Sequence, residues 1–400
     1  MAERPLAGTF VKKARPQPAI HDAPLSLFAG FTVAAMFGLI FVGGLVTSWQ
    51  AGMAVPDWPL SFGSLNPEGW WGDLPVRLEH GHRIFASIVG LIVTILCAWV
   101  WRNGWPLLIA LLTSASLSPL TKMAGLPPFV VMHVGIWSFA GAFAAALILM
   151  GRRYPSPRSR LVCGLAFAAF VGVCLQATFG GLRVTLETAG HFSAAMTLRI
   201  VHGCVAQAEL CLVVALAVML SRWWNSAALP GAHGELPATL RLARDTVASV
   251  FAQLILGAAM RHLGAGLAIP TFPQAKPGGG FLPDLNPYAV LNFLHTRVGA
   301  FFVTLLILGL VASIFRMKPG VALLTRPAWL LLGLLLLQVG LGMSIVWHQK
   351  PVTLTTVHVV NGAAILATSL VIALRTCRLA RGGENALSHV AARSLQEVSV

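Results

Sequence analysis

Four histidines lie inside strongly apolar stretches of the chain: His82, His202, His295 and His358. An ionisable side chain within an apolar span is costly, so it indicates a functional site by default. Two neutral imidazoles at equal depth on facing helices are what ligation of a haem iron by two histidines requires. The alternative is that each histidine makes a hydrogen bond to another helix of the bundle.

The sequence around these histidines repeats, which favours the haem interpretation. "EHGHRIFASIVG" resembles "FLHTRVGAFFV", and this similarity aligns His82 with His295. "LQATFGGLRV" and "RIVHGCVA" resemble "LQVGLGMSIV" and "TVHVVNGA", and this similarity aligns His202 with His358. Each copy therefore contributes one histidine pair, which predicts two haems, one in each half of the chain.

Two arginines stand close to the histidines. Arg83 follows His82 directly, and Arg297 lies two residues beyond His295. Haem propionates are anionic, and a guanidinium group can hold a carboxylate with two hydrogen bonds. The alternative is an arginine at the end of a span that reaches to the membrane surface.

Glu79 makes the two copies chemically different. It lies three residues before His82 on the same helical face, whereas the matching position in the second copy is Asn292. A carboxylate beside an apolar pocket can transfer a proton, and an amide cannot. The alternative is a carboxylate that caps the start of the span. His133 also lies near the outer end of a span but has no counterpart, so it remains an alternative ligand.

The composition indicates a polytopic membrane protein. The 400 residues are 56% hydrophobic and 10% charged, and the mean hydropathy is +0.77; soluble domains carry about 25% charged residues. The net charge of +15 predicts no nucleic-acid binding, because most of the 28 Lys and Arg lie in segments expected to be cytoplasmic. The six cysteines contain no CxxC pair and lie in or beside apolar stretches, which indicates neither a disulfide framework nor a zinc site.

About ten spans can be identified from the apolar stretches. They cover about 27–49, 78–101, 104–120, 128–150, 161–182, 196–221, 246–263, 287–315, 327–347 and 353–374. We expect the protein to lie in the plasma membrane. The positive-inside rule then places both the N-terminus and the C-terminus in the cytoplasm. The outer loops are then 50–77, 121–127, 183–195, 264–286 and 348–352. The four repeated histidines fall towards the outer leaflet.

The first and fourth outer loops repeat as well. "QAGMAVPDWP" (50–59) and "GAGLAIPTFP" (264–273) share five identical residues in register. The offset between the copies falls by about 50 residues further along, and an inserted pair of spans at about 104–150 would explain this. The sequence thus predicts an all-α polytopic membrane bundle of two pseudo-repeated four-helix halves plus an inserted two-helix hairpin. The predicted segments are an N-terminal tail (1–26), the first half (27–222), a cytoplasmic linker (223–245), the second half (246–375) and a C-terminal tail (376–400).

With these motifs in order, the chain resembles the heme A synthase family. The resemblance is carried by "GGLVTSWQAGMAVPDWP", "EHGHR", "QATFGGLRV", "VHG", "NFLHTRVGA" and "QVGLG", and it spans most of residues 40–363. It implies that His295 and His358 bind a haem b cofactor, whereas His82 and His202 receive the substrate heme O. It also implies that Glu79 takes the place of an acidic residue thought to act in catalysis.

The reaction that this resemblance implies is oxidation of the C8 methyl group of heme O to a formyl group, which gives heme A for cytochrome oxidase. The implied partners are heme O synthase and the cytochrome oxidase assembly machinery, in the lipid bilayer. The sequence leaves open the electron partner and whether the chain forms a homo-oligomer. Many family members carry a cysteine pair in the first outer loop, which this chain lacks, and the inserted hairpin is also outside the common pattern.

Two other functions are compatible with the same histidines. A membrane b-type cytochrome would hold two haems b, modify neither and need no Glu79. A haem-handling protein would bind one haem reversibly without catalysis, and the Trp pair of "EGWWGD" faintly favours this. An ordinary secondary transporter would explain the repeat but not the paired histidines.

Overall fold

The computed structural model describes residues 22–102, 106, 109, 125–153, 159–225, 236–276, 278–317 and 322–397. Within these residues it is helical, and nine helices are long and apolar enough to cross a membrane. This confirms the predicted polytopic helical bundle. The third predicted span, 104–120, lies almost entirely outside the described residues.

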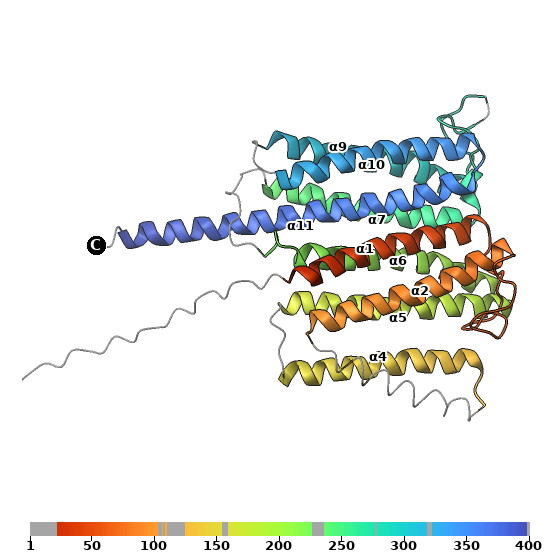
Figure 1. The fold of residues 1–400 in the computed structure, drawn as a ribbon. Coiled ribbons are helices and arrows are strands. Elements are labelled where there is room, and N and C mark those ends of the chain that lie inside the picture. Colours follow the sequence, from red (N-terminus) through yellow and green to blue (C-terminus); the bar gives the residue numbers. More distant parts are fainter. Residues whose placement is uncertain are drawn as a thin grey trace, which may run out of the picture.

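The helices are arranged along a common direction (Figure 1). Those of the first half are α1 (Ala23–Ser48), α2 (Leu74–Val100), α4 (Pro128–Arg153), α5 (Arg160–Thr188) and α6 (Phe192–Leu220). Those of the second half are α7 (Leu236–His262), η1 (Ala265–Leu267), α8 (Pro287–Phe293), the π-helical segment η2 (Leu294–Gly299), α9 (Ala300–Arg316), α10 (Ala322–Trp347) and α11 (Val352–Glu397). The segments α8, η2 and α9 form one continuous span.

Helix packing separates the bundle into two groups of four spans. In the first group α1 packs on α2 and α6, and α5 packs on the same two helices. In the second group α7 packs on α9 and α11, and α10 packs on the same two. The groups meet along a seam in which α1 contacts α11 and α6 contacts both α7 and α11. Helix α4 lies at the edge of the bundle beside α5 (Figure 1).

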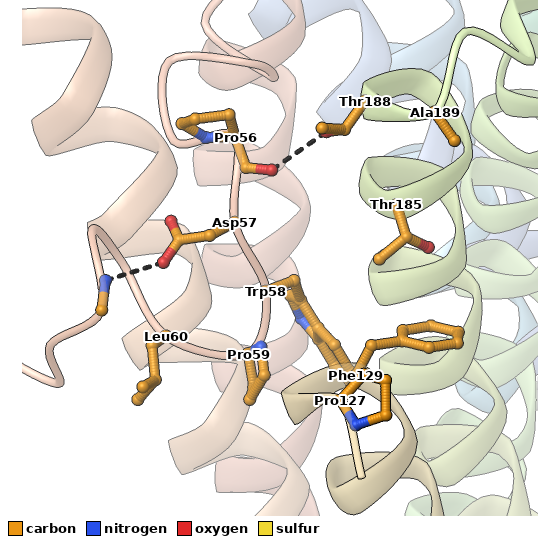
Figure 2. Close-up of a pocket in the computed structure, with 11 residues that line it drawn as sticks. Pro56, Asp57, Trp58, Pro59, Leu60, Pro127, Phe129, Thr185, Thr188 and Ala189 are labelled. Carbon is orange, nitrogen blue, oxygen red and sulfur yellow. Dashed lines mark hydrogen bonds between the residues drawn. The ribbon is translucent and has the colours of Figure 1, made fainter. Parts of the chain in front are cut away.

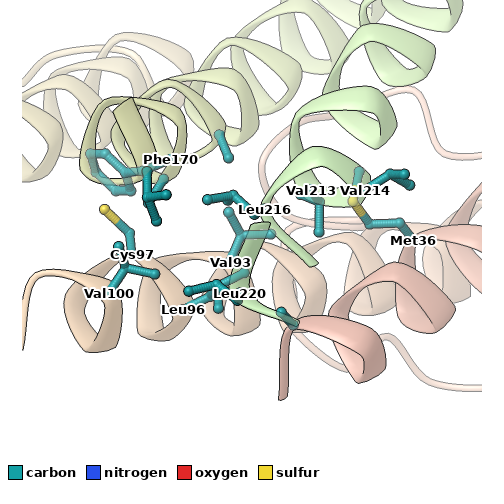
Figure 3. Close-up of a cluster of buried hydrophobic side chains, with 14 of the residues drawn as sticks. Met36, Val93, Leu96, Cys97, Val100, Phe170, Val213, Val214, Leu216 and Leu220 are labelled. Atoms are coloured by element: carbon teal, nitrogen blue, oxygen red, sulfur yellow. The ribbon is translucent and has the colours of Figure 1, made fainter. Parts of the chain in front are cut away.

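Each group has its own apolar core. In the first, side chains from α1, α2, α5 and α6 interdigitate, among them Met36, Leu96, Phe170 and Leu216 (Figure 3). In the second, buried residues of α7, α9, α10 and α11 pack together. All six cysteines are free in the structure.

The structure corrects the predicted outer loop at 183–195. Helix α5 continues to Thr188 and α6 begins at Phe192, so only residues 189–191 connect them. No Gly or Pro interrupts 183–188, and Gly190, two residues after the end of α5, has a φ of 83°, in the left-handed region that glycine adopts just past helix ends. The charged residues in this range therefore have fixed helical positions.

Two further boundaries differ from the prediction. Helix α7 begins at Leu236, within the segment assigned to the linker 223–245. Helix α11 continues to Glu397, through most of the predicted tail 376–400, because the sequence after the span contains no proline that would break it. The longer helices do not change the number of described spans.

Arg83 attaches the first repeated loop to α2. Its Nη1 donates hydrogen bonds to the carbonyls of Asp57 (2.7 Å) and Leu60 (2.9 Å), and its Nη2 donates to that of Val55 (2.8 Å). We call the end of the bundle that carries this loop and its repeat the loop face; it lies at the right in Figure 1. Backbone carbonyls in an irregular loop need donors, and one guanidinium group satisfies three of them.

Arg297 makes the same attachment in the second half. Its Nη2 donates to the carbonyls of Thr271 (2.6 Å) and Gln274 (2.9 Å), which lie 214 residues after the equivalent acceptors of the first loop. Arg297 itself also lies 214 residues after Arg83, whereas His295 lies only 213 residues after His82. The π-helical segment η2 absorbs this one additional residue, as a π-bulge does. Both the histidine and the arginine therefore keep their places.

Candidate functional site

The structure brings the four repeated histidines together in two pairs. His82 on α2 lies within electrostatic range of His202 on α6, and His358 on α11 lies within range of His295 on η2. Each pair joins two helices of the same group of four. The sequence repeat predicted this pairing, and the helix packing provides it.

Each imidazole ring lies against a glycine of a neighbouring helix. A Cβ built on these glycines would approach the ring Cε1 as follows: Gly43 to His82 (3.1 Å), Gly180 to His202 (3.6 Å), Gly257 to His295 (2.7 Å) and Gly342 to His358 (3.5 Å). The absence of side chains leaves the rings space beside the helix backbone. The glycines repeat with the same offsets as the surrounding sequence, 214 for the first pair and 162 for the second.

Hydrogen bonding distinguishes the two interpretations of the histidines. In all four, Nδ1 is buried and has no hydrogen-bond partner among the described residues. Among the four rings and the part of the chain that the structure describes, only His358 has a polar contact to another helix, between its Nε2 and Nε2 of Gln338 (3.2 Å). A buried polar atom without a partner is costly. Hydrogen bonds between helices therefore do not explain why these histidines are buried. Their residue type, their pairing and the glycine beside each ring fit ligation of two haem irons, each by two histidines.

Glu79 is buried at the start of the first site, with 2% of its surface exposed. Its Oε1 accepts a hydrogen bond from Arg83 (2.8 Å), and its Oε2 accepts one from the backbone N–H of Val55 (2.9 Å). Arg183 of α5 lies 3.6 Å from Oε1. The carboxylate is thus held between two guanidinium groups, one turn before His82 on the same helix.

Asn292 takes the equivalent place in the second half. It is fully buried and donates hydrogen bonds to the carbonyls of Ala265 (2.9 Å) and Gly266 (3.1 Å). Both residues therefore hold the neighbouring loop, but only Glu79 adds a negative charge. The role of Glu79 in proton transfer stays a prediction.

The two arginines and His133, which were also predicted site residues, make contacts with nearby parts of the chain. Arg83 and Arg297 bond to loop carbonyls, as described above, and their contact with propionates stays a prediction. His133 contacts Trp58 of the first loop, with ring centroids 5.1 Å apart, and its Nδ1 faces the carbonyl of Phe129 (2.8 Å). Its role as an alternative ligand is likewise untested.

A cavity of about 450 Å³ opens beside Trp58 (Figure 2). It lies between the first loop, the start of α4 and the end of α5, with Phe129 and Thr185 among its lining residues. None of the four paired histidines lines it. The Trp58 ring fits against Gly181, where a Cβ would lie 2.7 Å from the indole.

Several charged residues near the first site were not considered in the sequence analysis. Arg183 forms ion pairs with Glu79 and Glu187, and Arg199 forms a second ion pair with Glu187. Arg261, at the end of α7, crosses the seam and bonds to α1. The spacing of Arg183 and Glu187, four residues apart, was the available signal. It was missed because this range was assigned to a loop.

A model of the cytochrome oxidase assembly protein family matches residues 76–370 of the chain. The chain belongs to the heme A synthase family. The match includes all four paired histidines and Glu79, so the resemblance seen in the sequence motifs is confirmed.

Curated members of the heme A synthase family are similar over parts of the chain. The heme A synthase of Brucella ovis is 35% identical over 92 residues, which cover 21% of this chain and 26% of that protein. The heme A synthase of Bradyrhizobium sp. (strain BTAi1) is 32% identical over 178 residues, or 40% of this chain and 47% of that protein. The chain thus matches about a quarter to a half of the length of these relatives.

Proposed function

We propose that this protein is a heme A synthase, which oxidises the C8 methyl group of heme O to a formyl group. The observation that carries the proposal is the presence of two histidine pairs in repeated glycine cradles, with a carboxylate beside the first pair only. Relatives that bear the name heme A synthase support it. The four histidines and the carboxylate lie near the starts of helices that begin at the loop face, and the positive-inside rule predicts that this face lies outside the cytoplasm.

In this proposal the two halves have different roles. His82 and His202 bind the substrate heme O, and His295 and His358 hold a haem b for electron transfer. A bound haem iron would supply the redox chemistry for the successive oxidations of the methyl group. Written with water as the oxygen source, the methyl group and one water give a formyl group, four protons and four electrons, and the electrons would leave through the second-half haem to an electron acceptor. Glu79 exchanges the protons that these oxidations release, and its two arginine neighbours keep the carboxylate oriented. Heme O synthase supplies the substrate, and cytochrome oxidase assembly uses the product.

The test is to express the chain with a heme O synthase in membranes that contain no other heme A synthase. Extracted haems are identified by mass. We expect heme A, together with haem b that remains bound to the purified chain. Two haems b per chain and unconverted heme O would instead favour an electron-transfer cytochrome.

The glycine cradles provide a separate test of haem binding. Gly257→Ala places a methyl group 2.7 Å from the His295 ring, and such overpacking typically costs about 1–3 kcal/mol. We expect the absorbance of the second-half haem to fall by roughly 10-fold per purified chain. Gly342→Ala is the matched control in the same half, because its methyl group would stand at an ordinary 3.5 Å from His358. Equal effects of the two substitutions would count against haem binding between these cradles.

A further inference from the structure

Three arginines and a histidine gather at the loop face, where α5, α6 and α7 meet. Arg183 lies near the end of α5, Arg199 lies in the second turn of α6, and Arg261 and His262 close α7. His262 lies within electrostatic range of all three arginines and also of His202. We call these four residues the basic cluster, and it stands beside the ligand pair of the first half.

Positive charge exceeds negative charge around the basic cluster. Arg83 and Arg183 share Glu79, and Arg183 and Arg199 share Glu187. Four guanidinium groups, including that of Arg261, therefore face two carboxylates. The Nε of Arg199 is buried without a hydrogen-bond partner among the described residues. Buried positive charge that exceeds the nearby negative charge is unfavourable, so this region is suited to receive anions.

Arg261 brings a charge from the second half into this region. Its Nη2 donates to the carbonyl of Gly44 (2.9 Å) and to Oγ of Ser48 (2.6 Å), both on α1. No carboxylate of the described residues lies within ion-pair distance of it. Gly44 follows the glycine that cradles His82, so Arg261 is fixed across the seam beside the first site. Electrostatically it also acts on His358 of the second site.

The second half lacks the corresponding charges. The positions aligned with Arg183, Glu187 and Arg199 are Ile345, Gln349 and Thr355. The basic cluster therefore combines Arg183 and Arg199 of the first half with Arg261 and His262 of the second, and the second half has no equivalent of Arg183 and Arg199. An anion-binding function of these two arginines would serve the ligand of the first histidine pair.

We infer that the basic cluster binds the two carboxylates of the haem held by His82 and His202. This inference rests on the proposed function and names the part of the substrate that the cluster recognises. A haem carries two propionates, and arginine matches the geometry of a carboxylate.

Arg83 is committed to the first loop, and Arg183 donates to the carbonyl of Gly52 (2.6 Å) and pairs with both carboxylates. Arg199 and Arg261 therefore supply the charge that an incoming carboxylate meets. The substrate site is then complete only when the two halves are packed together.

The experiment compares haem b, which has two free propionates, with its dimethyl ester, which has none. Full-length protein that retains its second-half haem is titrated with each compound, and binding at the first site is followed by absorbance. Wild-type protein should bind the diacid at least 10-fold more tightly than the ester. Arg199→Gln and Arg261→Gln should lose most of this preference by weakening the diacid only. Arg261→Lys, which keeps the charge, should retain part of it.

Arg241→Gln is the matched control, because Arg241 lies exposed on α7, five turns before the basic cluster. Bound haem at His295 and His358 reports that each variant is folded. Wild-type protein that binds both compounds equally, or variants that weaken both equally, would overturn the inference and leave the proposed function standing. Wild-type protein that takes up no haem at either site would overturn the proposed function, and the inference with it.

Discussion

Glu79→Gln is expected to lower the rate of heme A formation by about 100-fold to 10,000-fold, the usual contribution of a positioned proton-transfer group. Glutamine is close to glutamate in size and can still accept the hydrogen bond from the N–H of Val55. The substitution removes the charge and the exchangeable proton but preserves the tether to the first loop. Haem extraction and mass identification over a time course measure the effect.

The hydrogen bond from Val55 to Glu79 suggests a different outcome if Glu79 has only a structural role. If Glu79 served only to hold the loop, as Asn292 does in the second half, the amide would suffice and the rate would stay within a few-fold of wild type. Glu68→Gln, an exposed carboxylate in the same loop, controls for the general loss of a negative charge. Haem content must be equal in all three proteins, so that the comparison reports chemistry rather than binding.

Removal of single histidines is expected to have different effects in the two halves of the protein. His82→Ala and His202→Ala should abolish heme A formation while the second-half haem remains bound. His295→Ala and His358→Ala should remove that haem and with it the electron path. Loss of a residue that hydrogen-bonds to a metal ligand typically lowers metal affinity by about 10-fold to 100-fold. Loss of a histidine ligand itself should therefore lower haem affinity by more than this. Absorbance spectra of the purified proteins and the extracted haems measure both effects.

His133→Ala tests the alternative ligand in the same assays. Its ring packs on Trp58 and its Nδ1 faces its own helix, so we expect spectra and product close to wild type. A loss of the first-half haem in this variant, with His82→Ala or His202→Ala still loaded, would reassign the ligand pair. Identical spectra for the His82 and His295 variants would contradict the division of roles between the halves.

The sequence was informative where function depends on residue type at a repeated spacing. Apolar stretches of about 20 residues identified the described spans, because the membrane thickness sets the length of a helix that crosses it. The aligned motifs also grouped the histidines into the two pairs that lie near one another in the structure. Helix ends were predicted less well: the range 183–195 was assigned to a loop, whereas Arg183 and Glu187 form an ion pair along helix α5. A hydropathy profile responds to the polarity of such residues, but it does not show that they form an ion pair with each other.

The sequence by itself determined the fold class, the duplication and the four histidines, since each follows from composition or from local spacing. Only the tertiary structure decided what surrounds them. It placed Arg83 and Arg297 on loop carbonyls 214 residues apart, with a π-helical segment absorbing the one-residue difference. It also brought Arg261 across the seam to α1. These contacts join residues that are distant in the chain, and their partners are backbone carbonyls, which carry no residue-type signal that a sequence could reveal.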